Sequence, residues 1–118
     1  MLINPNTDLD EIKIDIKVDH DDDDRGVKRA AISAIAYIKG AIGINKPSFY
    51  TENSETVELL NTAIIMLTDH YYNARSATIE SSTANGTLRE YDLGFTSILL
   101  QLKGKYASFE EGDLDVSQ

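Results

Sequence analysis

Between Ser54 and Ala77, apolar residues recur at helical spacing, and this pattern constrains the fold more than any other stretch of the chain. Six of them step by three or four along one face of a helix: Val57, Leu60, Ile64, Leu67, Tyr71 and Ala74. Ile65 and Met66 widen the apolar strip. A strip of this width is typical of a helix that packs on more than one neighbour. The sequence therefore predicts a helical bundle organised around residues 54–77.

A short helix over residues 8–17 is the preferred interpretation of the first apolar pattern. Leu9, Ile12 and Ile16 step by three and four, and Thr7 stands where an N-cap would accept backbone hydrogen bonds. The same stretch also alternates between apolar and polar residues, which suits a strand equally well. We prefer a helix because no other segment offers a convincing partner strand.

Two further patterns complete the expected bundle. One helix is predicted over 21–42, and its apolar face comprises Val27, Ala31, Ile35, Ile38 and Ile42. The other is predicted over 93–104, where Gly104 would end it, and its inward residues are Leu93, Ile98, Leu99, Leu102 and Tyr106. In the loop between the second and third helices, Phe49 and Tyr50 are expected to fold back onto the core.

The segment before the last helix carries a weak hairpin signal. Asn85-Gly86 is a dipeptide typical of a tight β-turn, but its flanks are poor strands and a lone two-stranded hairpin is marginal in water. We therefore expect a long loop or weak hairpin over 78–91 that is either mobile or completed by another molecule. The predicted fold class is all-α, a bundle of about four helices. It forms a single domain over 1–106, followed by a flexible acidic tail over 107–118.

Charge is distributed unevenly along the chain. The net charge is −9, with −7 in residues 1–24, +2 in 25–106 and −4 in 107–118. Such a surface repels phosphate, which argues against a sequence-specific DNA reader. There is no cysteine, so disulfides and thiolate metal sites are excluded. The sequence also predicts neither a signal peptide nor a membrane span.

The acidic run over residues 19–24 has two interpretations. A calcium-binding EF-hand loop needs a glycine at its sixth position and a glutamate at its twelfth, and both possible registers fail. The preferred interpretation is the start of a helix, with Asp19 or Asp21 as N-cap. Ion pairs are then expected one turn apart, between Asp21 and Arg25 and between Asp24 and Lys28.

The end of the third helix carries the most chemically suggestive cluster: Asp69, His70, Tyr71, Tyr72 and Arg75. Adjacent residues on a helix do not face each other, so Asp69 is not positioned to orient His70 as a general base. No nucleophile turn and no glycine-rich phosphate loop accompanies the cluster. We therefore expect no catalytic residue, no cofactor, no metal ligand and no enzyme activity.

The order of these elements resembles the head–tail connector family of tailed bacteriophages, also described as adaptor, head-completion or DNA-packaging proteins. The resemblance covers about residues 7–106, and its sharpest motifs are Val18-Asp19-His20-Asp21-Asp22-Asp23-Asp24 and His70-Tyr71-Tyr72-Asn73-Ala74-Arg75. The chain departs from the family pattern in two places: Ala74 separates Asn73 from Arg75, and Asp92-Leu93-Gly94 lacks the usual proline.

The resemblance implies a non-enzymatic ring of about a dozen copies beneath the portal. The implied partners are further copies of the chain, the portal protein and the next tail-completion (stopper) protein, while DNA passes through without specific binding and no membrane is involved. The implied location is the head–tail junction of the virion, after synthesis in the host cytoplasm. In similar proteins the loop before the last helix rearranges on assembly, and the C-terminal tail grips the portal.

Residues expected to take part in assembly come from the 78–91 loop, the tail and the end of the third helix. They are Arg75, Thr78, Ile79, Asn85, Gly86, Leu88, Arg89, Tyr91, Phe109, Leu114 and Val116. The alternative function is a small acidic DNA mimic or regulator that binds a DNA-binding partner, suggested by the net charge of −9. A metal-dependent hydrolase is a third possibility and would need a metal ion at residues 19–24.

Overall fold

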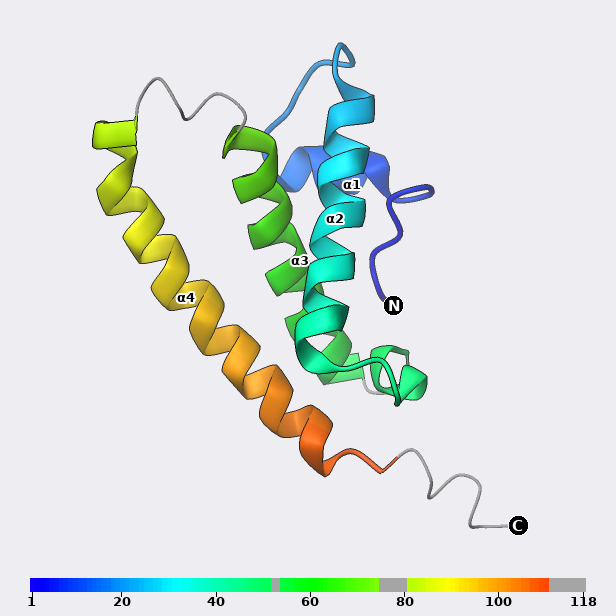
Figure 1. Ribbon diagram of the computed structural model, residues 1–118. Helices are drawn as coiled ribbons and strands as arrows, with labels where there is room; N and C mark the ends of the chain where they lie inside the picture. Colours follow the sequence, from blue (N-terminus) through cyan, green and yellow to red (C-terminus); the bar gives the residue numbers. More distant parts are fainter. Residues whose placement is uncertain (52–53, 75–80, 111–118) are drawn as a thin grey trace.

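Four α-helices and one short 3-10 helix form the described part of the chain. The structure is a computed structural model that describes residues 1–51, 54–74 and 81–110; for residues 54 and 81–93 it describes the backbone only. The elements are α1 (Leu9–Asp15), α2 (Asp24–Ile42), η1 (Pro47–Tyr50), α3 (Ser54–Ala74) and α4 (Ser81–Ser108) (Figure 1). No strand occurs within those described ranges. The prediction of an all-α fold is therefore confirmed, as is the choice of a helix for the first element.

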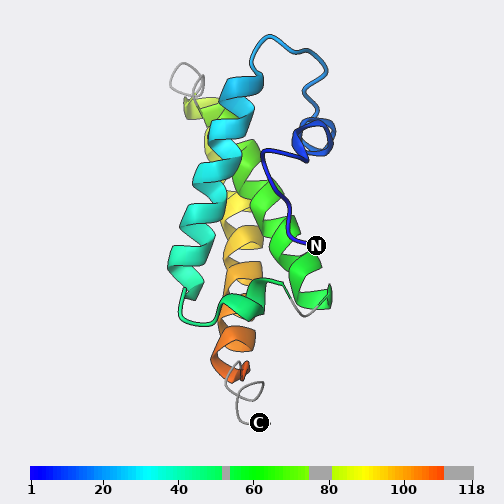
Figure 2. The same cartoon turned by 90° about the vertical axis from the view of Figure 1, so that its right-hand side faces the viewer.

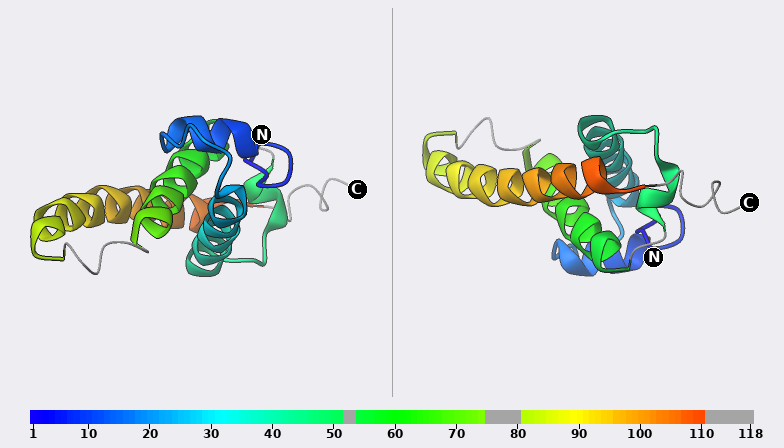
Figure 3. Two further views of the ribbon diagram at one scale, coloured as in Figure 1. Left: turned by 90° about the horizontal axis from the view of Figure 1, so that it is seen from above. Right: turned by 90° about the horizontal axis from the view of Figure 1, so that it is seen from below.

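The helix α3 is central to the arrangement. It runs antiparallel to α2 at its side, and α4 returns obliquely across it (Figure 1). The short α1 lies across the first half of α2, and Figures 2 and 3 place α1 and α4 on different sides of α3. The predicted role of the third helix as the centre of the bundle is confirmed, because α3 contacts α2, α4 and η1.

The main core lies between α2, α3 and α4. Val57, Leu60, Ile64 and Leu67 of α3 are buried as predicted, whereas Tyr71 is only half-buried. They pack with residues of the other elements: Ala34, Ile38, Ile42, Phe49, Tyr50, Phe95 and Leu102. Full burial of a side chain the size of leucine contributes roughly 1.5–3 kcal/mol to stability, so this cluster supplies most of the driving force for the fold.

A second, smaller core joins α1 to α2. Ile12 and Ile16 of α1 pack with Val27 and Ala31 of α2, and all four are buried. Ile65 and other half-buried apolar residues surround them. The apolar stripe that predicted the first helix is thus the face by which α1 attaches to the bundle.

The ends of α1 differ from the prediction. The N-cap is Asp8 instead of Thr7, and the Asp8 carboxylate accepts a hydrogen bond from the backbone N–H of Asn4 at 2.9 Å. The helix ends at Asp15 because Lys17 adopts a left-handed conformation with φ of 63°. The N–H of Val18 then bonds to the carbonyl of Lys13 at 2.8 Å, the hydrogen bond that defines a Schellman motif.

The last helix is much longer than predicted. α4 begins at Ser81 instead of residue 93 and ends at Ser108, so Gly104 does not terminate it. α4 includes residues 81–91 of the loop or hairpin expected over 78–91, and residues 78–80 lie outside the described part of the chain. A glycine inside a helix costs only about 1 kcal/mol, so α4 can continue through Gly104.

Candidate functional site

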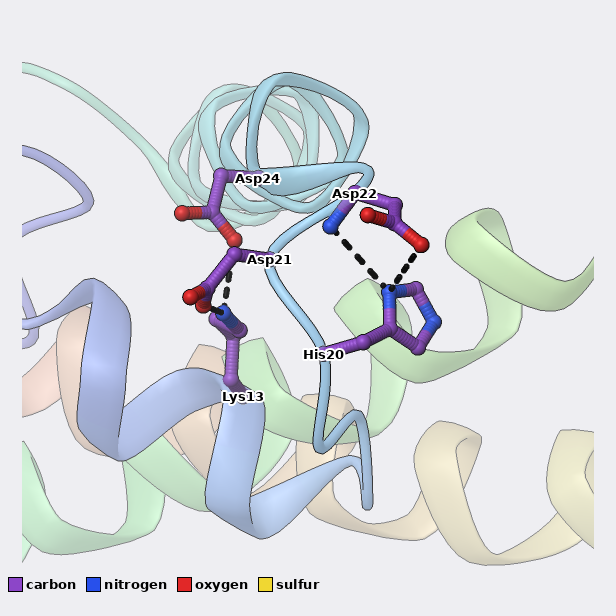
Figure 4. Close-up of polar contacts among 5 residues, drawn as sticks. All are labelled: Lys13, His20, Asp21, Asp22 and Asp24. Carbon is purple, nitrogen blue, oxygen red and sulfur yellow. Dashed lines mark hydrogen bonds and ion pairs between the residues drawn. The ribbon is translucent and has the colours of Figure 1, made fainter.

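A buried lysine joins α1 to the start of α2. The ammonium of Lys13 lies 2.6 Å from Oδ1 of Asp21 and 2.6 Å from Oδ1 of Asp24 (Figure 4). Its side chain is only 8% exposed. The hydrogen bonds that Lys13 donates to Asp21 and then to Asp24 raise the pKa of Lys13 above its ordinary value, although desolvation opposes them. The same contact with Lys13 lowers the pKa of the Asp21 carboxyl.

This arrangement corrects the expected role of the acidic run. Neither Asp19 nor Asp21 caps α2, which begins at Asp24 after the N-cap Asp23. The pairs predicted between Asp21 and Arg25 and between Asp24 and Lys28 are not formed, because both carboxylates contact Lys13 instead. A buried cation needs compensation more than the exposed Arg25 and the partly exposed Lys28 do, which explains why the tertiary contact prevails.

The rest of the run faces outward. His20 is half-exposed, and its Nδ1 accepts a hydrogen bond from the backbone N–H of Asp22 at 3.3 Å (Figure 4). Within the ranges that the structure describes, no group of three histidine, cysteine or acidic side chains is placed to hold a metal ion. Nor is any helix there both long and apolar enough to cross a membrane.

The polar cluster at the end of α3 is held by contacts along the helix. Asn73 donates a hydrogen bond to the Asp69 carboxylate at 2.5 Å and another to the Asp69 carbonyl at 2.9 Å. Partial burial raises the pKa of Asp69, while the bond from Asn73 acts in the opposite direction. The ring of His70 lies 6.2 Å from that of Tyr71. Asp69 thus orients Asn73, the residue on its own face of the helix.

Two surface hollows have opposite charge. The larger, of about 750 Å³, lies between the first half of α2 and the end of α3, and it is lined by Asp23, Arg25, Gly26, Arg29, Ala30, Ser33, Tyr71 and Tyr72. The smaller, of about 450 Å³, lies between α1 and α3, and it is lined by Met1, Ile3, Asp8, Glu11, Asp15, Glu58, Asn61, Thr62 and Ile65. The first therefore suits an anionic group and the second a cationic one.

The structure describes few of the residues predicted to take part in assembly. Phe109 is the one whose side chain is placed: its ring lies 5.5 Å from that of Phe49. Five others lie in α4 where only the backbone is described, namely Asn85, Gly86, Leu88, Arg89 and Tyr91. The remaining five fall outside the described residues, namely Arg75, Thr78, Ile79, Leu114 and Val116.

Comparison with protein families decides the class of the protein. The model of the phage gp6-like head-tail connector protein family matches residues 6–103. The chain belongs to this family. Neither a search of curated proteins nor a search of solved structures gave a match. Membership makes the chain a structural component that joins phage head and tail, with partners among the head and tail proteins; this family is not enzymatic.

The connector chain holds the end of α4 by means of the loop before α3. The Lys46 ammonium donates hydrogen bonds to the carbonyls of Tyr106 at 2.9 Å and Phe109 at 2.8 Å. The Lys46 backbone N–H donates to the Tyr106 hydroxyl at 2.9 Å. Lys46 thus adds hydrogen bonds to the last turn of α4 and to the residue that follows it, as cationic side chains near a helix C-terminus commonly do.

Four aromatic rings surround these hydrogen bonds. The ring of Phe49 lies 5.4 Å from Tyr50, 5.0 Å from Tyr106 and 5.5 Å from Phe109, each time edge to face. We call Phe49, Tyr50, Tyr106 and Phe109 the C-terminal aromatic cluster. Its two members from η1 are buried, which confirms the prediction that they fold back onto the core. In this connector the family match ends at residue 103, before Tyr106 and Phe109.

Sequence reasoning missed two features of the connector. The Lys13 ion pairs were missed because their partners are eight or more residues away and meet only when α1 packs on α2. The role of Lys46 was missed because no periodic pattern marks a loop residue. One signal was available for the first feature: Lys13 directly follows Ile12, a core residue, and therefore lies close to the buried face of α1.

Proposed function

We propose that this connector assembles into a closed ring of about a dozen copies beneath the portal of the DNA-filled head. There it would join head to tail, extend the DNA channel and present a platform to the next tail-completion protein. The observation that carries this proposal is the family match over residues 6–103, which spans α1, α2, α3 and α4 as far as Lys103.

The charge of the chain supports a channel through which DNA passes without binding. A net charge of −9 offers phosphates no release of counterions, which is the main source of nonspecific affinity for DNA. The same property disfavours adhesion to the duplex during ejection. Gel-shift titration of the assembled ring with duplex DNA at low salt should therefore show no binding, and salt-sensitive binding would contradict this role.

The residues after Glu110 are proposed to contact the portal. Removal of 107–118 would also remove Phe109, a member of the C-terminal aromatic cluster. The informative truncation therefore ends at Glu110 and retains the contacts of Lys46. We expect it to keep the melting temperature of the full chain but to lose portal binding in pull-down. A matched control replaces residues 111–118 by glycine and serine and should behave like the truncation; binding by either variant would remove this segment from the proposal.

Electron microscopy of the chain mixed with its portal tests the proposed function directly. We expect ring-shaped density of one connector layer on one end of the portal, coaxial with the channel. The portal alone and the connector alone, at the same concentrations, are the controls. Binding to a site on the side of the portal, or the absence of a ring at any concentration with portal present, would contradict the proposal.

A further inference from the structure

The exposed face of α1 carries acids and an uncovered isoleucine. Ile14 is 74% exposed, and Asp10, Glu11 and Asp15 surround it on the helix surface. The one lysine of this helix, Lys13, turns inward to Asp21 and Asp24. Within the described residues the three acids form no ion pair. We call Asp10, Glu11, Ile14 and Asp15 the acidic α1 face.

The exposed face of α2 carries bases and an uncovered isoleucine. Ile32 is 50% exposed, and Arg25, Lys28 and Arg29 lie within two turns before it. None of these three bases forms an ion pair with another described residue. Arg25 and Arg29 also line the hollow of about 750 Å³. We call Arg25, Lys28, Arg29 and Ile32 the basic α2 face.

The two faces point in opposite directions. α1 and α2 pack against each other through Ile12 and Ile16 on one helix and Val27 and Ala31 on the other. At 100° per residue, Ile14 lies on the side of α1 opposite Ile12 and Ile16. By the same geometry, Arg25, Arg29 and Ile32 lie on the side of α2 opposite Val27 and Ala31. The centre of each face therefore points away from the contact that joins the two helices, while Asp15 and Lys28 lie at its edge. Figures 2 and 3 show how the two helices cross.

We propose that the acidic α1 face of one copy docks on the basic α2 face of the next. This inference rests on the proposed ring and names the surfaces that would build it. Two different, complementary faces on opposite sides of a subunit make a head-to-tail contact, which is the kind that closes into a ring. Three acids meet three bases, and each face supplies one exposed isoleucine to the apolar centre of the contact.

The hollows beside the two faces add to the charge complementarity of the contact. Glu11 and Asp15 line the acidic hollow between α1 and α3, and this hollow can receive a guanidinium group. Exposed ion pairs contribute little affinity individually, but they select which surfaces meet and they penalise wrong pairings. The charges therefore determine the order of the subunits, while the isoleucines contribute burial of apolar surface.

Charge reversal tests this contact in the full chain. One variant carries Glu11→Lys and Asp15→Lys, and another carries Arg25→Glu and Arg29→Glu. Each should raise the concentration needed for ring formation on the portal at least tenfold, because like charges then meet at every contact. The combined variant, with all four changes in one chain, should assemble like the native protein. An equimolar mixture of the two single-face variants should also assemble.

The controls separate this inference from the proposed function. Lys103→Glu with Lys105→Glu makes the same change in net charge as the α2 variant, at the other end of the chain, and should leave assembly unchanged. Circular dichroism establishes that each variant is folded, and rescue in the combined variant does so independently. Rings that form equally well with either single-face variant, or a combined variant that fails to assemble although folded, would overturn the contact while leaving the proposed function intact. A native chain that forms no ring on the portal would overturn the proposed function instead.

Discussion

The backbone of Gly43 lies directly against the ring of Tyr106. A β-carbon added at Gly43 would lie 2.6 Å from Cε1 and Cζ of that ring, too close for any side chain. Gly43 also has φ of +142°, a conformation that residues with a β-carbon rarely adopt. Glycine at this position therefore allows α2 to end here. It also allows Tyr106 of α4 to pack against the loop that follows α2.

Gly43→Ala should lower the free energy of unfolding by about 2–4 kcal/mol, because backbone strain and displacement of Tyr106 add together. Urea denaturation followed by circular dichroism measures the change. Gly40→Ala is the matched control, since nothing lies within 4 Å of its added β-carbon apart from its chain neighbours and the backbone of its own helix. That substitution lies in α2 and should raise stability by about 0.5–1 kcal/mol. Equal effects at the two positions would contradict the packing argument.

Lys13→Met should lower the melting temperature at neutral pH, because Asp21 and Asp24 lose their partner while the apolar stem remains. The lowered pKa of Asp21 means that its contribution is present above its ordinary value of 3.8 and is lost as the pH falls through the folded value. The raised pKa of Lys13 means that its contribution is complete below 10.5 and is lost as the pH rises toward the folded value.

The stability difference between native protein and Lys13→Met should therefore be largest between about pH 4 and pH 10 and should shrink on either side. Melting temperatures at a series of pH values provide the measurement. Lys28→Met, which removes a partly exposed lysine of α2, is the control and should show a small difference. A difference in melting temperature that stays constant below pH 3 would argue against the ion pairs.

Lys17→Gly should stabilise the fold by about 0.5–1 kcal/mol, because Lys17 holds the left-handed conformation that glycine adopts at no steric cost. Lys28→Gly, in the middle of regular helix, should instead destabilise by about 1 kcal/mol. Urea titrations of both variants show whether each substitution raises or lowers the free energy of unfolding. A loss of stability at residue 17 would mean that its side chain contributes more than its backbone costs.

Tyr50→Phe should change both stability and its dependence on alkaline pH. The Tyr50 hydroxyl donates to the Gly43 carbonyl at 2.6 Å, and removal of this hydrogen bond should cost about 1 kcal/mol at pH 8. Burial, with a smaller effect of Tyr106, raises the pKa of Tyr50 from 10.0 to about 12. The unfolded chain therefore loses this proton first, and stability falls as the pH rises from 10 to 12. The variant should show a shallower fall over that interval in urea titrations.

Much of the fold could be predicted from helical periodicity. The stripe from Val57 to Leu67 identified the central helix, and Ile12 and Ile16 identified the buried face of α1. Periodicity reports burial, so it succeeds wherever a helix has one apolar side. It gave the wrong end for α4 because Gly104 is a local signal of a helix end, and the helix continues past it to Ser108.

The candidate site was less accessible to sequence reasoning. The contacts of Lys13 and Lys46 join residues that are separate along the chain, and no local spacing announces them. The acidic and basic helix faces depend on which side of α1 and α2 is covered, which becomes known only when their packing is known. The family, by contrast, was suggested by the order of the elements, and the match over residues 6–103 confirms it.

The hydrogen bonds from Lys46 to the end of α4 have a mechanical consequence. A pull on the chain beyond Phe109 first meets the hydrogen bonds from Lys46 to the carbonyls of Tyr106, in the last turn of α4, and of Phe109, just after it. The load passes through Lys46 and the ring of Phe49 into the loop between α2 and α3, and so to the buried core. Tension applied at this end is therefore shared by α2, α3 and α4, whose side chains form that core.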